Sequence, residues 1–256
     1  MNLFVQATAS LAIREIQRFF RQPSRVLAAL GTPLLFWLVL GSGLGTSFRP
    51  SEGPVDQHFL KYFFPGVVML TVMFTAIFST ISIIEDRSAG FLQGVLVSPA
   101  PRSSVVLGKV LGGTVLALIQ GGLFLFLAPL AGFGLSLSSF LLSLGFLLLT
   151  AFALTSLGFL IAWRMDSIQG FHAMMNLLLM PLWMLSGAVF PASGALGWIR
   201  ILIAANPLSY GVSGLRAVLE GGSPQGPSPA LCGAVLALAS LLLFGASSLA
   251  AHKKEK

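Results

Sequence analysis

Residues 85–109 read EDRSAGFLQGVLVSPAPRSSVVLGK. This stretch starts with charged residues, contains two prolines and separates two long apolar segments, in a chain that carries few charges elsewhere. A short polar loop between two apolar segments is what a membrane-embedded domain presents to water. The fold therefore depends on how many apolar segments on either side of this loop cross a bilayer.

The composition places the chain in a membrane. Of its 256 residues 55% are hydrophobic and 9% are charged, and the mean hydropathy is +0.90. Soluble domains are roughly a quarter charged, so this chain has too few charges to cover a soluble globule. The net charge of +7 is scattered near the ends of apolar runs, which suits anionic lipid headgroups and argues against nucleic acid as a partner. A single cysteine, Cys232, excludes an intramolecular disulfide and a cysteine metal cluster.

Six apolar runs are long enough to cross the hydrocarbon core, which takes about 20 helical residues. They are 26–47, 62–84, 105–130, 137–162, 171–190 and 230–251. The sequence therefore predicts an all-α polytopic membrane protein with six transmembrane helices, forming a single transmembrane domain over residues 1–256.

Residues 1–25 predict an amphipathic helix lying in the membrane interface. Four arginines spaced four, three and four apart share one helical face, and apolar residues such as Ile13 and Phe20 share the other. Such a helix turns its arginines toward headgroups. Two roles stay open: a basic anchor that sets topology, or an elbow helix that touches a cytoplasmic partner. The arginines are Arg14, Arg18, Arg21 and Arg25.

Residues 191–229 are apolar but contain Arg200 and Arg216 and are interrupted at Asn206-Pro207. A basic residue near the centre of a membrane helix costs about 3 kcal/mol, and a proline disfavours helix at the preceding residue. We therefore expect two short helices of about 12 residues in an extracytoplasmic re-entrant region, rather than a seventh span.

An even number of spans puts both termini on the same side of the membrane. Eleven basic residues fall in segments on that side and four on the other. Because cytoplasmic loops carry the excess of basic residues, we expect both termini and the 85–104 loop in the cytoplasm, in a multi-pass cytoplasmic (inner) membrane protein.

The loop itself predicts a short helix over residues 88–97. On it Phe91, Leu92, Val95 and Leu96 would form a compact apolar patch, and the prolines at 99 and 101 would end it. Such a helix either rests on the lipid surface or plugs a groove on a soluble protein.

Two motifs carry a resemblance to a known family. The pattern Glu85-Asp86, Gly90, Leu96, Ser98-Pro99, Arg102 and Gly108-Lys109 resembles the cytoplasmic loop of the type-two ABC exporter permeases, which export drugs, lipids and polysaccharides. Asn206-Pro207-Leu208-Ser209-Tyr210 with Arg216 is similar to that family's asparagine-proline motif before the last span. The resemblance covers nearly the whole chain.

The resemblance implies an ATP-driven exporter in which this chain is the permease subunit for an amphipathic drug, a lipid or a glycan-type substrate. The loop would be a coupling helix that docks on one of two ATPase subunits, and a second permease copy, identical or homologous, would complete the export path. The residues that it implies for docking are Glu85, Asp86, Gly90, Phe91, Leu92, Val95 and Leu96, with Arg102 positioning the next turn. Those that it implies for the outer exit are Asn206, Pro207, Tyr210 and Arg216.

The energy source is expected in a partner chain. The sequence has no G-x-x-x-x-G-K-[ST] phosphate loop, since Gly108-Lys109 is followed by Val110 and lacks the upstream glycine. ATP and Mg²⁺ are therefore expected on the partner ATPase, and the chain is expected to be a transport subunit without catalytic residues. Histidines at metal-ligand spacing are also absent, so the sequence predicts no metal site.

Few polar residues interrupt the predicted spans. Gln120, His172 and Asn176 are the main candidates to line a substrate path, and their small number favours an amphipathic cargo over a strongly hydrophilic glycan. His172 and Asn176 lie one helical turn apart, so a hydrogen-bonded pair that fixes helix contacts is the alternative interpretation.

Two other function classes fit the sequence less well. Gly211-Val212-Ser213-Gly214 matches the serine motif of rhomboid proteases, but the only later histidine, His252, is expected about 30 Å away across the bilayer. A stand-alone secondary transporter would carry carboxylates inside its spans, and this chain has none there. The Gly108-x-x-x-Gly112 spacing permits close helix packing and gives faint support for a homodimer.

Overall fold

The structure is a computed structural model that describes residues 3–44, 59–191, 194–222 and 226–252, apart from the side chains of residues 23–26, 28, 44 and 96. All regular elements in these ranges are helices, which confirms the predicted all-α class. In chain order they are α1 (Leu3–Phe20), α2 (Pro23–Leu44), α3 (Phe59–Ser79), α4 (Ile81–Ser88), α5 (Phe91–Val97), α6 (Arg102–Leu125), η2 (Ala128–Ala131), α7 (Leu137–Ala162), α8 (Ile168–Trp183), η3 (Met184–Ala188), α9 (Gly197–Ala205), α10 (Pro207–Leu219) and α11 (Pro229–His252).

Five helical segments are long and apolar enough to cross a membrane. They are Phe59–Ser88, Arg102–Leu125, Leu137–Ala162, Ile168–Ala188 and Pro229–His252. The described apolar part of α2, Ala29–Gly43, is shorter. The five segments agree with the predicted multi-pass membrane protein, and the sixth span stays a prediction.

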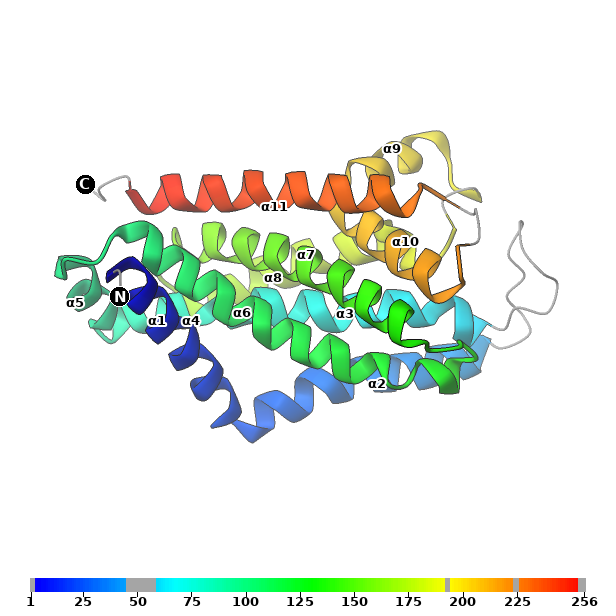
Figure 1. Ribbon diagram of the computed structural model, residues 1–256, viewed down its shortest axis with the longest axis horizontal. Coiled ribbons are helices and arrows are strands. Elements are labelled where there is room, and N and C mark those ends of the chain that lie inside the picture. Colours follow the sequence, from blue (N-terminus) through cyan, green and yellow to red (C-terminus); the bar gives the residue numbers. More distant parts are fainter. Residues whose placement is uncertain (1–2, 45–58, 192–193, 223–225, 253–256) are drawn as a thin grey trace.

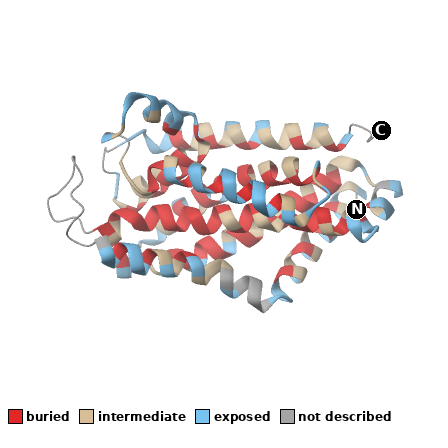
Figure 2. Cartoon of the chain, turned by 180° about the vertical axis from the view of Figure 1, so that it is seen from behind, coloured by how far each residue is buried: buried red, intermediate tan, exposed pale blue. Residues whose placement is uncertain are grey.

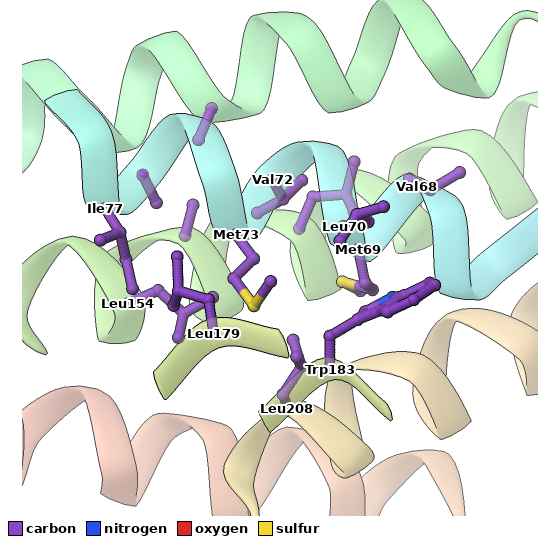
Figure 3. Packing of buried hydrophobic residues seen from close by; sticks show 14 of the residues in the cluster. Val68, Met69, Leu70, Val72, Met73, Ile77, Leu154, Leu179, Trp183 and Leu208 are labelled. Atoms are coloured by element: carbon purple, nitrogen blue, oxygen red, sulfur yellow. The ribbon is translucent and has the colours of Figure 1, made fainter. Parts of the chain in front are cut away.

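Helix α3 is the centre of the bundle. It is buried along nearly its whole length and contacts α2, α6, α7, α8 and α10, as Figure 2 shows by its almost unbroken buried colour. Figure 3 shows the side chains that surround Met69 and Met73 of α3, among them Leu154 of α7 and Leu179 and Trp183 of α8. An all-round apolar helix of this kind belongs in the interior of a bundle.

Helix α11 packs on α7 through two serines. The Ser240 hydroxyl donates to the carbonyl of Leu149 over 3.0 Å, and the Ser247 hydroxyl donates to the carbonyl of Ser156 over 2.8 Å. The two serines are seven residues apart and therefore lie on one helical face. The opposite face of α11 is exposed and leucine-rich, as a lipid-facing surface would be.

The two ends of the bundle differ. Figure 1 shows α1, α5 and the His252 end of α11 at one end, with α9 and α10 at the other. The expected interruption at Asn206-Pro207 is present, because α9 ends at Ala205 and α10 begins at Pro207. The first end carries the loop motif and the second end the asparagine-proline motif.

Candidate functional site

The loop helix is shorter than the sequence predicts. Helix α4 ends at Ser88, Gly90 has a φ of 74°, and α5 begins at Phe91 rather than at residue 88. Glycine adopts this left-handed backbone without the steric cost that other residues incur. The helix ends just before the two prolines, as predicted. Helix α5 ends at Val97, where the Ser98 hydroxyl donates to the Val95 carbonyl over 2.6 Å, and Pro101 directly precedes the first residue of α6.

The predicted apolar patch of α5 is divided between the interior and the surface. Leu92 is only 3% exposed and belongs to the core, against which Val95 also packs. Phe91 is exposed on one side, and the guanidinium of Arg14 lies 3.8 Å from its ring centroid. Val97 is 86% exposed. The backbone of Leu96 lies in α5, but its side chain is outside the described part.

The acidic residues of the loop motif meet two of the predicted interfacial arginines. Arg14 donates twice to the Asp86 carboxylate, over 2.7 Å each, and Arg18 donates to Asp86 over 3.1 Å and to Glu85 over 2.5 Å. These bonds raise the pKa of the Arg14 guanidinium above its usual value. Arg14 and Arg18 therefore point toward α4, whereas the sequence predicted that they face lipid headgroups. Arg21 is exposed, and the Arg25 side chain is outside the described part.

A buried lysine completes this cluster. Lys109 of α6 donates to Glu15 of α1 over 2.6 Å, to the hydroxyl of Ser82 over 3.2 Å, and to Asp86. Asp86 is 2% exposed and Lys109 and Glu15 are each 5% exposed. A buried charge needs such partners, because leaving it unpaired away from water is expensive. Asp86 thus lies beneath the surface at the junction of α1, α4 and α6.

Close packing of α1 on α6 brings these charges together. A Cβ atom at Gly108 would lie 2.8 Å from the Cβ of Leu11, and one at Gly112 would lie 2.7 Å from the Cβ of Glu15. The glycine spacing that hinted at a homodimer therefore serves a contact within the chain. The face of α1 toward α6 also differs from the predicted apolar face, since Ile13 and Phe20 are exposed.

Two further arginines fasten the loop to other helices. Arg102 donates to the carbonyls of Ala251 (3.2 Å) and His252 (3.4 Å), in the last turn of α11. Arg87 donates to the carbonyls of Trp163 and Met165 and to Asp166, just after α7. The loop is therefore held at both of its ends.

The asparagine-proline motif holds an irregular end of α8. Asn206 caps α10 by accepting from the backbone N–H of Leu208, and its amide donates to the carbonyls of Leu182 (2.7 Å) and Leu185 (3.3 Å). These carbonyls lie where α8 passes into the π-helical turn η3, whose wider winding leaves backbone groups in need of partners. Pro207 occupies the first turn of α10, where its missing N–H costs nothing.

Arg216 supports the same turn from the other end of α10. Its guanidinium donates to the carbonyls of Gly187 (3.1 Å) and Tyr62 (3.3 Å) and lies 4.2 Å from the Tyr62 ring centroid. Tyr210 donates to the Ala204 carbonyl over 2.9 Å and so ties α10 to α9. Burial raises the pKa of the Glu220 carboxyl, although the positive charges of Arg216 and Lys61 act to lower it.

The three candidate path residues are not brought together. Gln120 is buried and accepts from Thr75, and its amide nitrogen has no partner among the described residues. The His172 ring packs against the Phe78 ring at a tilt of 34°, with centroids 5.1 Å apart, and within the described ranges neither His172 nor Asn176 makes a hydrogen bond. The alternative of a hydrogen-bonded pair between these two residues is thus not observed.

His172 lines an apolar cavity of about 300 Å³ between α1, α2, α3 and α8. Most of its wall is aromatic or aliphatic, and hydroxyls of Thr32, Thr75 and Ser79 add a few polar groups. Its largest lining side chains are Phe19, Phe36, Phe74, Phe78 and Met180.

The protease-like motif serves packing. A Cβ atom at Gly214 would lie 2.3 Å from the Phe146 ring, and one at Gly211 would lie 2.7 Å from the Thr150 hydroxyl, so both glycines allow α10 to approach α7. His252 contacts the Ser248 carbonyl at the end of α11, which is the end of the bundle away from α10 in Figure 1.

Residues 6–219 match the family model described as ABC-2 type transporter. The chain belongs to this family. Similar proteins include ycf38 of Cyanophora paradoxa, named as a transport permease, at 28% identity over 83% of this chain and 74% of the relative. The daunorubicin resistance ABC transporter permease protein DrrB1 of Streptomyces coeruleorubidus is 22% identical over 85% and 76%. Nodulation protein J of Sinorhizobium fredii is 28% identical over 75% and 72%.

Membership of the ABC-2 family makes the chain a multi-pass permease subunit of an ABC transporter. ABC-2 permeases normally work with ATPase subunits. The protease and stand-alone transporter alternatives are accordingly not favoured.

Sequence reasoning missed Glu15, the role of Lys109 and the supporting contacts of Arg87 and Tyr62. One local signal was available, since Glu15 is the only acidic residue of the arginine-rich helix α1.

Proposed function

We propose that this chain is the membrane subunit of an inner-membrane exporter, driven by two separate ATPase subunits that bind ATP and Mg²⁺. A second permease copy completes the path. The observation that carries the proposal is the loop between the spanning segments Phe59–Ser88 and Arg102–Leu125: α5 is exposed on one side and anchored by Leu92 on the other.

The loop has the geometry of a docking element. Helix α5 lies between α4, which continues into α3 after a turn at Thr80, and α6. A partner that displaces α5 would therefore move two membrane-spanning helices as rigid bodies, and tilting of packed helices is an established way to switch access across a membrane. The ion pairs that Arg14 and Arg18 form with Glu85 and Asp86 would hold the loop in this position.

The proposed topology has six spans, cytoplasmic termini and an outer re-entrant hairpin. Helix α2 has 22 residues, about 33 Å at 1.5 Å per residue, which is enough for the missing span. Ile13 and Phe20 of α1 are exposed and apolar, which supports burial of that helix surface in inner-leaflet lipid. Helix α9, with Trp198 and Ile201 exposed, suits the outer interface in the same way.

An amphipathic drug or lipid is the cargo that the cavity supports best. A site of about 300 Å³ with phenylalanine walls, one histidine and three hydroxyls matches apolar ligands that carry a few polar groups. The resistance function named for the Streptomyces relative supports the same class. A fully hydrophilic glycan would leave its hydroxyls unpaired in such a cavity.

Reconstitution tests the proposal. The permease and its partner ATPase are purified together and placed in proteoliposomes, and ATP-dependent movement of a fluorescent amphipathic drug is measured. The expected result is transport that disappears with a hydrolysis-deficient ATPase. Transport of the drug by the permease alone would overturn the proposal.

A further inference from the structure

The carboxylate of Asp86 has no capacity left for a partner protein. A carboxylate offers about four lone-pair positions to donors. Arg14 supplies two N–H groups, Arg18 supplies one and Lys109 supplies one. Because Asp86 is also 2% exposed, a cationic group on another subunit could neither reach it nor replace a donor cheaply.

The surrounding charges cancel as well. Glu85 is bonded to Arg18 over 2.5 Å, and Glu15 is bonded to Lys109 over 2.6 Å. Among the side chains that the structure describes, the cluster thus contains three carboxylates and three cations, whose charges cancel. The acidic pair at the foot of the loop therefore presents no net negative potential to the aqueous side.

The loop beyond this cluster carries no charge. Residues 88–101, SAGFLQGVLVSPAP, contain no acidic or basic side chain. The arginines that bracket them, Arg87 and Arg102, are engaged with backbone carbonyls at the ends of α7 and α11. What remains for contact is uncharged: Val97 is 86% exposed and Phe91 is 37% exposed, and the polar side chain of Gln93 is exposed on the same short helix.

We propose that the partner ATPase receives this loop in an uncharged, apolar groove that takes up Val97 and the open side of Phe91. In this arrangement Glu85 and Asp86 are positioning residues, which fasten α1 and α6 to the foot of the loop and do not contact the ATPase. The inference rests on the proposed function, because it describes the chemistry of the same docking site.

Salt and one added charge test the groove. The tagged permease is used to retain its partner ATPase, in NaCl from about 0.05 to about 0.5 M, a range that screens exposed ion pairs. We expect the retained ATPase to vary less than about two-fold, since an uncharged interface gains little from screening-sensitive attraction. Val97→Asp should lower retention about ten-fold or more, because it places a charge in the apolar contact.

A matched control introduces the same charge elsewhere. Ser167 lies at the same end of the bundle and caps α8 by accepting from the N–H of Gly170. Ser167→Asp keeps an acceptor for this cap and should leave retention unchanged.

A charge swap tests the positioning role in the absence of any ATPase. Glu85→Arg should lower the thermal midpoint of the detergent-solubilised permease, since it faces Arg18 with a like charge. Arg18→Glu combined with Glu85→Arg should recover part of this loss, because the swap restores the pair but removes the Arg18 bond to Asp86. The double variant should also restore ATPase retention. Both side chains are partly exposed, so the single variants are expected to fold.

The outcomes separate the two levels of the proposal. Retention that collapses in salt, a harmless Val97→Asp, or a double swap that recovers part of the midpoint but no ATPase retention would overturn this inference and leave the proposed function standing. Failure of the wild-type chain to retain the ATPase at any salt concentration would overturn both.

Discussion

Lys109 on α6 donates a hydrogen bond to Glu15 on α1 over 2.6 Å, although the two residues are 94 positions apart in the sequence. Both side chains are buried at the α1–α6 contact. At a buried site, the attraction between the two charges offsets the free energy lost on removing them from water only while both partners are present. Removing one partner is therefore expected to cost far more than removing both.

Lys109→Met tests this pair. It removes the hydrogen-bonding cation of the buried Glu15, which then has only the more distant Arg14 at 3.7 Å, and should destabilise the folded permease by about 3–5 kcal/mol. Thermal unfolding in detergent is the measurement. Adding Glu15→Gln to Lys109→Met should recover part of the loss, and strictly additive losses would contradict the pairing.

Gly108→Ala tests the contact between α1 and α6. Its new Cβ would stand 2.8 Å from the Leu11 Cβ and 2.9 Å from the Thr8 carbonyl oxygen, so the helices must separate at a cost of about 1–3 kcal/mol. The control is Gly145→Ala on α7, where a Cβ meets nothing within 4 Å. A midpoint for Gly108→Ala equal to that of the control would show that α1 is free to shift.

Asn206→Asp separates the two roles of Asn206. An aspartate still caps α10, but it cannot donate to the carbonyls of Leu182 and Leu185, which should cost about 1–3 kcal/mol. Asn206→Ala loses the cap too and should cost about 1 kcal/mol more. Protease resistance and thermal midpoint are the readouts, and wild-type behaviour of Asn206→Asp would mean that the end of α8 does not need this support.

Phe74→Ala tests the cavity. Removing one aromatic wall should raise the KM for an amphipathic drug about five- to ten-fold through lost ring contacts, with ATPase retention unchanged. Leu177→Ala on α8, an exposed position outside the cavity, is the control. Equal KM changes in both variants would remove the cavity from the transport path.

The five membrane-spanning segments were predictable because their length and apolarity are local properties. The predicted run 137–162 coincides with α7, Leu137–Ala162, and the proline after Asn206 marks the start of α10. The loop helix began later than expected because Gly90 adopts a left-handed backbone, which the periodicity of apolar residues does not reveal.

The partners of the charged residues were not predictable. The spacing of Arg14 and Arg18 shows that they share a helical face, but it says nothing of what that face meets. Here it meets Asp86, 72 and 68 residues away. The spacing of the glycines in α6 likewise predicts close helix packing but does not identify the neighbouring helix, which is α1.

Arg102 joins the first turn of α6 to the final turn of α11 across 149 residues of sequence. A displacement of the loop would therefore also move α11, although α11 is far from the loop in the sequence. Helix α11, whose outer face is open to lipid, would then move together with α6. The resistance of the surrounding lipid to this movement would oppose each displacement of the loop.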